Sequence, residues 1–394
     1  MPRSPAVSSS RPALLDYFRG AVADLKHRPP GNVPALDVLR SLAILLVFSG
    51  HIAGEFHASH RISRIPLFYW GWTGVDLFFV LSGLLIGTQL WKEVQLTGTV
   101  RIGTFLLRRG LRIWPLYFSF VALLYLEVLF LGRRFSGLLA DTFFLSNYFH
   151  CQIGGGWSLS TEEQFYIVAP VCIWLAARLK FRRLGWLPVL GLLVPIVIRI
   201  LYRIFSSLSP AALKQYFYSP IHTHSDALAI GVLFAWLAVY RADLVRSRRF
   251  RLVASTVMFV VGAALYVTSQ LLFNFTALAL VFGSATFFSM GLNPSPRILN
   301  WHGFYLISRL SYGVYLNHFG LLPKMHDLLG TWGDGGGVGF WIAYLLSFCA
   351  SMAIAFVTFQ LIEWPFLKLR SQWMKTRRSE RVLKATPMHE KLAT

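Results

Sequence analysis

Charged residues and cysteines are both scarce in this chain of 394 residues. Asp, Glu, Lys and Arg make up 14% of it and hydrophobic residues 55%, so the chain lacks the polar surface of large soluble domains. Cys151, Cys172 and Cys349 show no paired spacing, which excludes an evident disulfide framework or cysteine-rich zinc site. The sequence also lacks a Gly-x-Ser-x-Gly elbow, a Gly-Lys phosphate loop and a His-Glu-x-x-His motif. Serine hydrolase, P-loop ATPase and zincin functions are therefore unsupported.

Acidic residues are few as well, 17 against 38 Lys and Arg, which gives a net charge of +21. We exclude a nucleic-acid partner because the basic residues form short clusters between apolar segments, as the positive-inside rule describes. Residues 1–32 contain no apolar core, which predicts that no signal peptide is cleaved and that the first apolar segment directs insertion. The two halves of the chain do not repeat, which weakens a transporter interpretation.

Long apolar runs are what the chain does have. Ten of them can cross a bilayer, and they predict an all-α, polytopic integral membrane protein with about ten transmembrane helices. With both termini in the cytoplasm, 28 of the 38 Lys and Arg fall on the cytoplasmic side. We predict a basic cytoplasmic arm (1–32), a transmembrane domain (33–366) and a basic cytoplasmic tail (367–394). The expected spans are 35–54, 66–90, 111–131, 161–178, 185–204, 222–240, 252–270, 273–291, 303–322 and 338–362.

The first span carries Arg40 and His51, eleven residues apart. Eleven helical steps are about 20° more than three turns, so both side chains share one face, about 16 Å apart along the axis. Polar groups inside a membrane are costly and usually face a bundle interior or cavity. Arg40 could instead extend to the cytoplasm and pair with Asp37. For His51 we favour a catalytic role as general base, since imidazole accepts protons near neutral pH.

Two further segments bring charge to expected spans. Asp76 follows Gly74-Val75 and could orient a histidine or form a buried ion pair, while Gly83 and Gly87 form a face for close helix packing. Arg108, Arg109 and Arg112 enter the third span from the cytoplasm. Such arginines fix helix orientation, or they grip the phosphates of a nucleotide thioester such as coenzyme A.

The segment from Trp157 to Tyr166 opens the fourth expected span. Ser160 and Glu163 have capping-box spacing, which gives Glu163 a structural explanation and leaves Glu162 as the functional candidate.

His222, His224 and Asp226 suggest a metal only weakly, since residues two apart on a helix do not face each other, and we predict no metal. Asp226 could still face the cavity. The ninth span offers Arg309, Tyr315 and His318, which inter-helix hydrogen bonds would also explain.

Taken together, the segments resemble acyltransferase family 3, a family of membrane O-acyltransferases. The resemblance covers about residues 33–366 and rests on the Arg40–His51 pair and on residues 74–83, 108–117, 157–166, 311–318 and 363–365. It implies ten helices with cytoplasmic ends, an acyl-CoA donor, commonly acetyl-CoA, and an acceptor hydroxyl, usually on a surface or exported glycan. Many members add an esterase-like domain after the last helix, and since this chain stops at residue 394 we expect it to resemble the stand-alone form.

The resemblance also implies roles for particular residues. Arg40 and His51 match the essential pair of the family, and Glu162 matches the carboxylate that follows its Trp-Ser-Leu motif. The basic cytoplasmic segment that handles the donor matches Arg108, Arg109 and Arg112. We expect His51, helped by Glu162 or Asp76, to deprotonate the acceptor, and Arg40 to hold the donor or stabilise the oxyanion. The candidate substrate-binding residues are Trp157, Tyr166, Asp226, Tyr315 and His318.

The sequence thus predicts a membrane O-acyltransferase of the bacterial inner membrane, with a polysaccharide synthesis or export apparatus as a possible partner. A macrolide-like glycosylated acceptor is an alternative, and so is a transporter or flippase of lipid-linked sugar. The sequence leaves open the acceptor, the acyl length, a covalent acyl-histidine and the oligomeric state.

Overall fold

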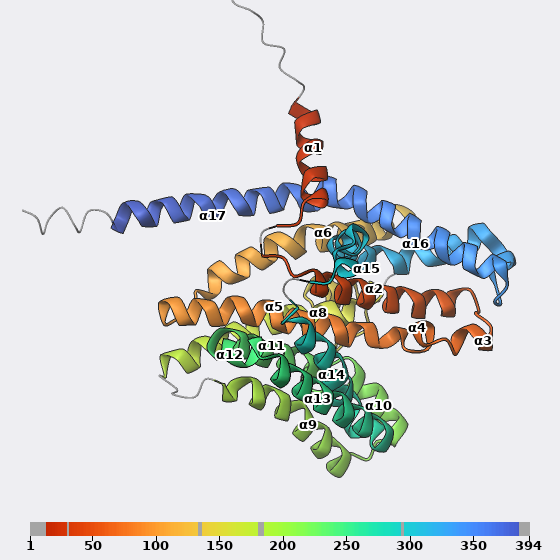
Figure 1. Ribbon diagram of the computed structural model, residues 1–394. Coiled ribbons are helices and arrows are strands. Elements are labelled where there is room, and N and C mark those ends of the chain that lie inside the picture. The colour runs from red at the N-terminus through yellow and green to blue at the C-terminus, as the bar shows by residue number, and fades with distance from the viewer. Residues whose placement is uncertain (1–12, 30, 133–135, 180–184, 293–294, 386–394) are drawn as a thin grey trace, which may run out of the picture.

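All regular elements of the computed structural model are helical within the residues that it describes, namely 13–29, 31–132, 136–179, 185–292 and 295–385. The long helices run side by side as a bundle (Figure 1). This confirms the all-α prediction. The elements are α1 (Ala13–Lys26), α2 (Pro34–Glu55), α3 (His60–Ser63), α4 (Pro66–Tyr69), η1 (Gly71–Thr73), α5 (Gly74–Thr97), α6 (Ile102–Leu131), α7 (Leu138–Thr142), α8 (Gly156–Arg178), α9 (Trp186–Phe205), α10 (Pro210–Tyr218), α11 (Asp226–Tyr240), α12 (Ala242–Arg246), α13 (Arg248–Thr268), α14 (Gln270–Ser289), η2 (Arg297–Asn300), α15 (His302–Leu329), η3 (Gly330–Gly333), α16 (Val338–Thr358), η4 (Phe359–Glu363) and α17 (Trp364–Ala385).

Seven helical segments in the described ranges are long and apolar enough to cross a membrane, as expected of a multi-pass integral membrane protein. The other three expected spans are also helical. Two of these helices, α8 and α15, carry polar residues of the candidate site, and the third, α11, has only 15 residues. The count of ten spans and the cytoplasmic location of the termini stay predictions.

Glycines let α5 and α11 pack backbone against backbone, as predicted for Gly83 and Gly87. A Cβ atom on Gly83 would lie 2.1 Å from the carbonyl oxygen of Leu228, and one on Gly87 would lie 2.8 Å from the Cβ of Ala235. From the other side, a Cβ on Gly231 would lie 2.3 Å from the carbonyl oxygen of Val80. Small residues at such positions allow the close approach on which helix packing in membranes depends.

Helix α1 lies within the segment that the sequence presents only as a basic arm. It stands across the direction of the long helices and meets them at its C-terminal end (Figure 1). Ala21 and Leu25 are buried there, and Asp24 forms an ion pair with Arg309 of α15 at 2.6 Å. The hydroxyl of Tyr17 donates a hydrogen bond to the carbonyl of Gln360 at 2.7 Å. These contacts fix α1 against the part of the bundle that holds the candidate site.

The helix of the last expected span continues past Glu363-Trp364-Pro365, although the sequence predicts that it ends there. Instead, α16 passes through a five-residue π-helical turn, η4, and continues as α17, which extends beyond the bundle (Figure 1). Pro365 is tolerated because it falls in the first turn of the new helix. A π turn inside a helix often marks a functional site, and here it brings Glu363 to a pocket.

Candidate active site

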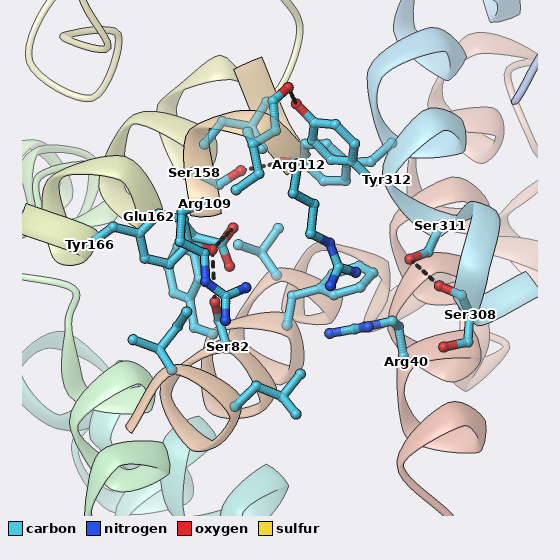
Figure 2. Close-up of a pocket in the computed structure, with 18 of the residues that line it drawn as sticks. Arg40, Ser82, Arg109, Arg112, Ser158, Glu162, Tyr166, Ser308, Ser311 and Tyr312 are labelled. Carbon is cyan, nitrogen blue, oxygen red and sulfur yellow. Dashed lines mark hydrogen bonds between the residues drawn. The ribbon is translucent and has the colours of Figure 1, made fainter. Parts of the chain in front are cut away.

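A pocket of about 910 Å³, in part continuous with solvent, lies between α2, α5, α6, α8 and α15. We call it the basic pocket, because four arginines and two glutamates line it. Figure 2 shows Arg40 of α2 and Arg109 and Arg112 of α6 entering it from different sides. The charged lining residues are Arg40, Arg109, Arg112, Arg309, Glu162 and Glu363.

Three of these guanidinium groups have hydrogen-bonding capacity to spare. Within the described residues, neither a hydrogen bond nor an ion pair engages the side chain of Arg40, Arg109 or Arg112; Arg109 lies over the ring of Tyr166, 5.9 Å from its centroid. Each guanidinium carries five N–H donors. Several such donors around one cavity suit an anion with many acceptor oxygens, such as a phosphate or pyrophosphate group.

Asp37 does not pair with Arg40, so the alternative interpretation of Arg40 as a snorkelling partner of Asp37 is wrong. Its carboxylate accepts hydrogen bonds from Asn32 Nδ2 at 2.7 Å and from Ser308 Oγ at 3.0 Å. Arg309, in contrast, is already neutralised by Asp24. Arg40 therefore faces the pocket, whose lining also includes Glu162.

Glu162 lies on the pocket wall with a hydrogen-bonded support. The hydroxyl of Tyr166, one turn later on α8, donates to its Oε2 at 3.2 Å, and Ser82 Oγ of α5 lies 3.1 Å from the same hydroxyl (Figure 2). Tyr166 thus lines the pocket, as expected of a substrate-binding candidate. Glu162 is placed to balance part of the positive charge of the arginines.

Glu163 has a partner other than the capping box that the sequence predicts. Helix α8 begins at Gly156, five residues before the expected span, so Ser160 and Glu163 both lie inside it. Ser160 Oγ accepts a hydrogen bond from the backbone N–H of Ser146, and Glu163 Oε2 accepts one from Trp114 Nε1 at 3.0 Å. The capping-box prediction is wrong, while a structural role for Glu163 remains.

His51 lies outside the basic pocket but faces the bundle. Its Nδ1 lies 3.1 Å from Nε2 of His318 on α15, and its ring packs on Phe319 with centroids 4.2 Å apart. We call His51 and His318 the histidine pair. No hydrogen bond or ion pair joins His51 to Glu162 or Asp76, so neither carboxylate contacts it here, and the expected help from one of them stays a prediction.

The contacts of His318 define the protonation of both rings in their neutral form. Its Nδ1 lies 2.7 Å from the carbonyl oxygen of Tyr315 and 3.1 Å from that of Val314, and because carbonyls only accept, Nδ1 carries the proton. Nε2 of His318 is then an acceptor, and Nδ1 of His51 must donate to it. His51 is left with an unprotonated Nε2, the form that a general base requires.

Tyr315 connects the basic pocket to the histidine pair. Its ring lines the pocket, and its hydroxyl forms a short hydrogen bond with Ser158 of α8 and donates to the carbonyl of Gly155 at 3.2 Å. Its backbone carbonyl is the one that holds His318. A ligand that reaches from the arginines toward His51 would therefore pass this tyrosine.

Asp76 and Trp157 belong to a separate polar cluster. Asp76 Oδ1 lies 2.9 Å from Nε2 of His224, whose ring stacks on that of Trp157 at 5.6 Å and on Phe275 at 3.7 Å. Asp76 thus orients a histidine, one of the roles that the sequence left open, but the histidine is not His51. Residues 222–225 precede α11 rather than lying on it, and His222 contacts Tyr148 instead of sharing a metal ligand set with His224.

Asp226 does not face the basic pocket, so its placement as a substrate-binding candidate is corrected. It forms a fully buried, bidentate ion pair with Arg199 of α9, at 2.8 and 2.9 Å. Arg199 also donates to Thr276 at 2.8 Å and to the carbonyl of Thr223 at 2.6 Å. Arg199 is thus fully buried, and Asp226 has a structural role.

We expect Asp226→Asn to lower the free energy of unfolding by about 3 kcal/mol, because breaking a buried pair leaves an uncompensated charge. Unfolding of the purified protein in detergent would measure the loss. Asp243→Asn is the matched control, since Asp243 pairs with Arg241 at 3.4 Å in an exposed position and should matter little. Equal, small effects of the two variants would contradict the structural role of Asp226.

Arg108 is the member of the predicted arginine group that does not line the basic pocket. The pairing of the two histidines and the Tyr315–Ser158 bond could not be predicted from the sequence, since both join residues more than 150 positions apart. The sequence places His51 and His318 on two apolar helices, but it does not show how those helices align with each other.

These features define a multi-pass membrane protein with a buried arginine-lined pocket and a histidine pair on two of its helices. Residues 33–360 match the family described as an acyltransferase domain, which is acyltransferase family 3. The chain belongs to this family.

The chain is similar in sequence to several bacterial proteins. The chain is 24% identical over 387 residues to "Putative O-acetyltransferase SACOL0978" of Staphylococcus aureus (strain COL), covering 87% of this chain and 58% of the relative. It is 31% identical over 185 residues to "Peptidoglycan O-acetyltransferase OatA" of Listeria monocytogenes, covering 42% of this chain and 27% of the relative. The chain thus spans little more than half the length of the first of these relatives. No solved structure matches it.

Proposed function

We propose that this protein transfers an acyl group, acetyl in the simplest case, from acyl-CoA to a hydroxyl group of a cell-surface or exported glycan. The observation that carries the proposal is the arrangement along α2. Near the N-terminus of α2, Arg40 lines the basic pocket together with other arginines. Near the C-terminus of α2, His51 contacts His318. The same two residues are the pair that the family resemblance singles out.

The basic pocket would hold the donor. Phosphate oxygens of coenzyme A can accept hydrogen bonds from Arg40, Arg109 and Arg112, which have few competing partners. Arg40 and His51 are eleven helical steps apart, about 16 Å along the axis, which is comparable with the length of an extended pantetheine arm. With the phosphates at the arginines, the thioester would lie beyond Tyr315, near the histidine pair.

His51 would supply the base. Its unprotonated Nε2 takes the proton of the acceptor hydroxyl, and the oxygen attacks the thioester carbonyl to form the ester. The thiolate of coenzyme A leaves and receives the proton back from the imidazolium, so that protons balance over one cycle. His318 acts as a positioning residue, because it accepts the Nδ1 proton of His51 and thereby holds the ring and its tautomer. Arg40 is too far along the helix to reach the same carbonyl, which favours donor binding over oxyanion stabilisation.

The acceptor class is argued from the relatives. One of them is named "Peptidoglycan O-acetyltransferase OatA", and others are named "O-acetyltransferase OatA" and "Putative O-acetyltransferase SACOL0978". A sugar hydroxyl outside the cytoplasm fits a multi-pass membrane protein with a donor pocket inside the bundle. A bacterial inner membrane and contact with glycan synthesis or export proteins are parts of this proposal.

The direct test uses the purified full chain in lipid vesicles with labelled acetyl-CoA and peptidoglycan or exopolysaccharide fragments. We expect acetylated acceptor, detected by mass spectrometry, in the absence of any transmembrane gradient. A folded protein that neither hydrolyses acetyl-CoA nor transfers the acetyl group, but moves lipid-linked sugar between leaflets, would overturn the proposal in favour of a flippase.

His318→Ala should lower kcat at least about tenfold with little change in the KM for acetyl-CoA, because the variant loses the orientation of His51 but keeps the basic pocket. His318→Gln retains one donor and one acceptor and should recover part of the rate. Steady-state kinetics with varied acetyl-CoA would measure both. A rise in KM alone would contradict the positioning role.

A further inference from the structure

A group of metal-ligating side chains lies at the end of the bundle where α2 and α15 both terminate. His57 follows α2, His326 lies in the last turn of α15, and Asp334 follows η3. Their potential ligand atoms all lie within 4.8 Å of one another. This end carries α3 and α4, on the right in Figure 1, and His57 is 73% exposed, so the group is open to the aqueous phase.

The two imidazoles converge on a single carboxylate oxygen. Nε2 of His326 lies 3.1 Å from Oδ1 of Asp334, and Nδ1 of His57 lies 3.5 Å from the same oxygen. Ligand atoms of a tetrahedral zinc ion at bond lengths of about 2.0–2.1 Å are separated by about 3.3 Å. The two distances fall on either side of this value, and the third, between the two histidine nitrogens, is at most 4.8 Å.

Backbone hydrogen bonds hold the loops around these residues in place without a bound metal ion. His57 has a φ angle of +44°, in the left-handed region that L residues other than Gly rarely adopt. Backbone hydrogen bonds join the loop after α2 to the turn after η3, from Gly335 N–H to the carbonyl of Phe56 and from Ser59 N–H to the carbonyl of Gly335. The ring of Phe56 packs edge-on against His326 at 5.1 Å. A disfavoured conformation that neighbours hold in place often marks a functional position.

We propose that His57, His326 and Asp334 bind a divalent transition-metal ion, zinc by preference. Two imidazoles and one carboxylate are a common zinc ligand set, with water in the fourth position. Hard ions such as Mg²⁺ and Ca²⁺ prefer oxygen ligands and should bind poorly. This proposal differs from the sequence prediction of no metal, because positions 57, 326 and 334 lie far apart along the chain and meet only in the fold.

A metal ion bound at this site would link the ends of α2 and α15, the two helices that carry the histidine pair. His57 lies six residues after His51 on the chain, and His326 lies eight residues after His318. A bound ion would therefore fix the ends of α2 and α15 relative to each other and so hold the histidine pair. The metal site itself does not depend on the proposed acyl transfer, because metal retention is measured without any reaction.

The test uses the full chain in detergent, purified without a polyhistidine tag, stripped with EDTA and then given Zn²⁺. We expect one zinc per chain after gel filtration, and a higher melting temperature with zinc than with EDTA. With Co²⁺ as the probe, visible absorption bands of a tetrahedral site should appear. Failure to retain zinc at micromolar concentration would overturn the proposal.

Variants assign the site. His57→Ala and Asp334→Asn should each weaken zinc binding at least tenfold and abolish the zinc-dependent rise in melting temperature. His60→Ala is the matched control, because it removes an exposed histidine three residues away and should leave binding unchanged. The melting temperature in EDTA shows whether each variant is folded. Equal zinc retention by His57→Ala, Asp334→Asn and the unaltered protein would also overturn the assignment.

Discussion

Replacement of His51 with alanine is expected to reduce acetyl transfer by at least about 100-fold, the lower end of what a positioned general base contributes. The reason lies in the tautomer. His318 donates its Nδ1 proton to the carbonyl of Tyr315, so its Nε2 accepts a proton from Nδ1 of His51. In its neutral form, His51 therefore has an unprotonated Nε2. Alanine removes that nitrogen while leaving the basic pocket untouched, so acetyl-CoA should still bind.

The measurement is a single-turnover transfer assay with labelled acetyl-CoA, beside an equilibrium binding assay for coenzyme A. His222→Ala is a suitable control, since it removes a histidine that contacts Tyr148 away from the histidine pair. Transfer by His51→Ala at more than a tenth of the unaltered rate would remove His51 from the chemistry. Loss of both transfer and binding would point to unfolding or to a role in binding the donor.

Replacement of Arg112 with alanine is expected to raise the KM for acetyl-CoA by about 10- to 100-fold. A hydrogen bond to a charged group contributes about 1.5–3 kcal/mol, and this guanidinium has no hydrogen-bond partner of its own among the described residues. Arg40→Ala and Arg109→Ala should act in the same direction. Because the arginines line one pocket, their effects should not be additive.

A shortened donor separates the phosphate contact from other roles. S-acetylpantetheine lacks the nucleotide and its phosphates, so its KM should be high in the unaltered protein and nearly unchanged by Arg112→Ala. Arg108→Ala serves as the control, since Arg108 does not line the pocket. A variant that impairs both donors equally would show that Arg112 supports the fold or the chemistry rather than the phosphates.

Helix content and the close packing of α5 could be predicted because they depend on local signals. Apolar length sets the spans, and Gly83 and Gly87 repeat at the spacing of one helix face. Six of the site residues predicted from the sequence line one pocket in the structure: Arg40, Arg109, Arg112, Glu162, Tyr166 and Tyr315.

Partnerships between distant segments could not be predicted, since an apolar helix can turn any of its faces to several neighbours. Asp76 has His224 as its partner and Asp226 has Arg199, although the sequence offered other arginines and histidines to both. Helix α1 was missed for a related reason. Its short apolar face is stable only through contacts such as Asp24–Arg309, which the local sequence does not reveal.

The π turn at Phe359–Glu363 holds one residue more than an α-helical turn would. Its five residues cover about the same rotation as four α-helical residues, which advance by about 100° each. Deletion of a single residue there would therefore restore a regular α-helix and leave α17 facing almost the same way. Homologous chains with a one-residue gap at this point should keep the direction of this last helix and lack only the bulge.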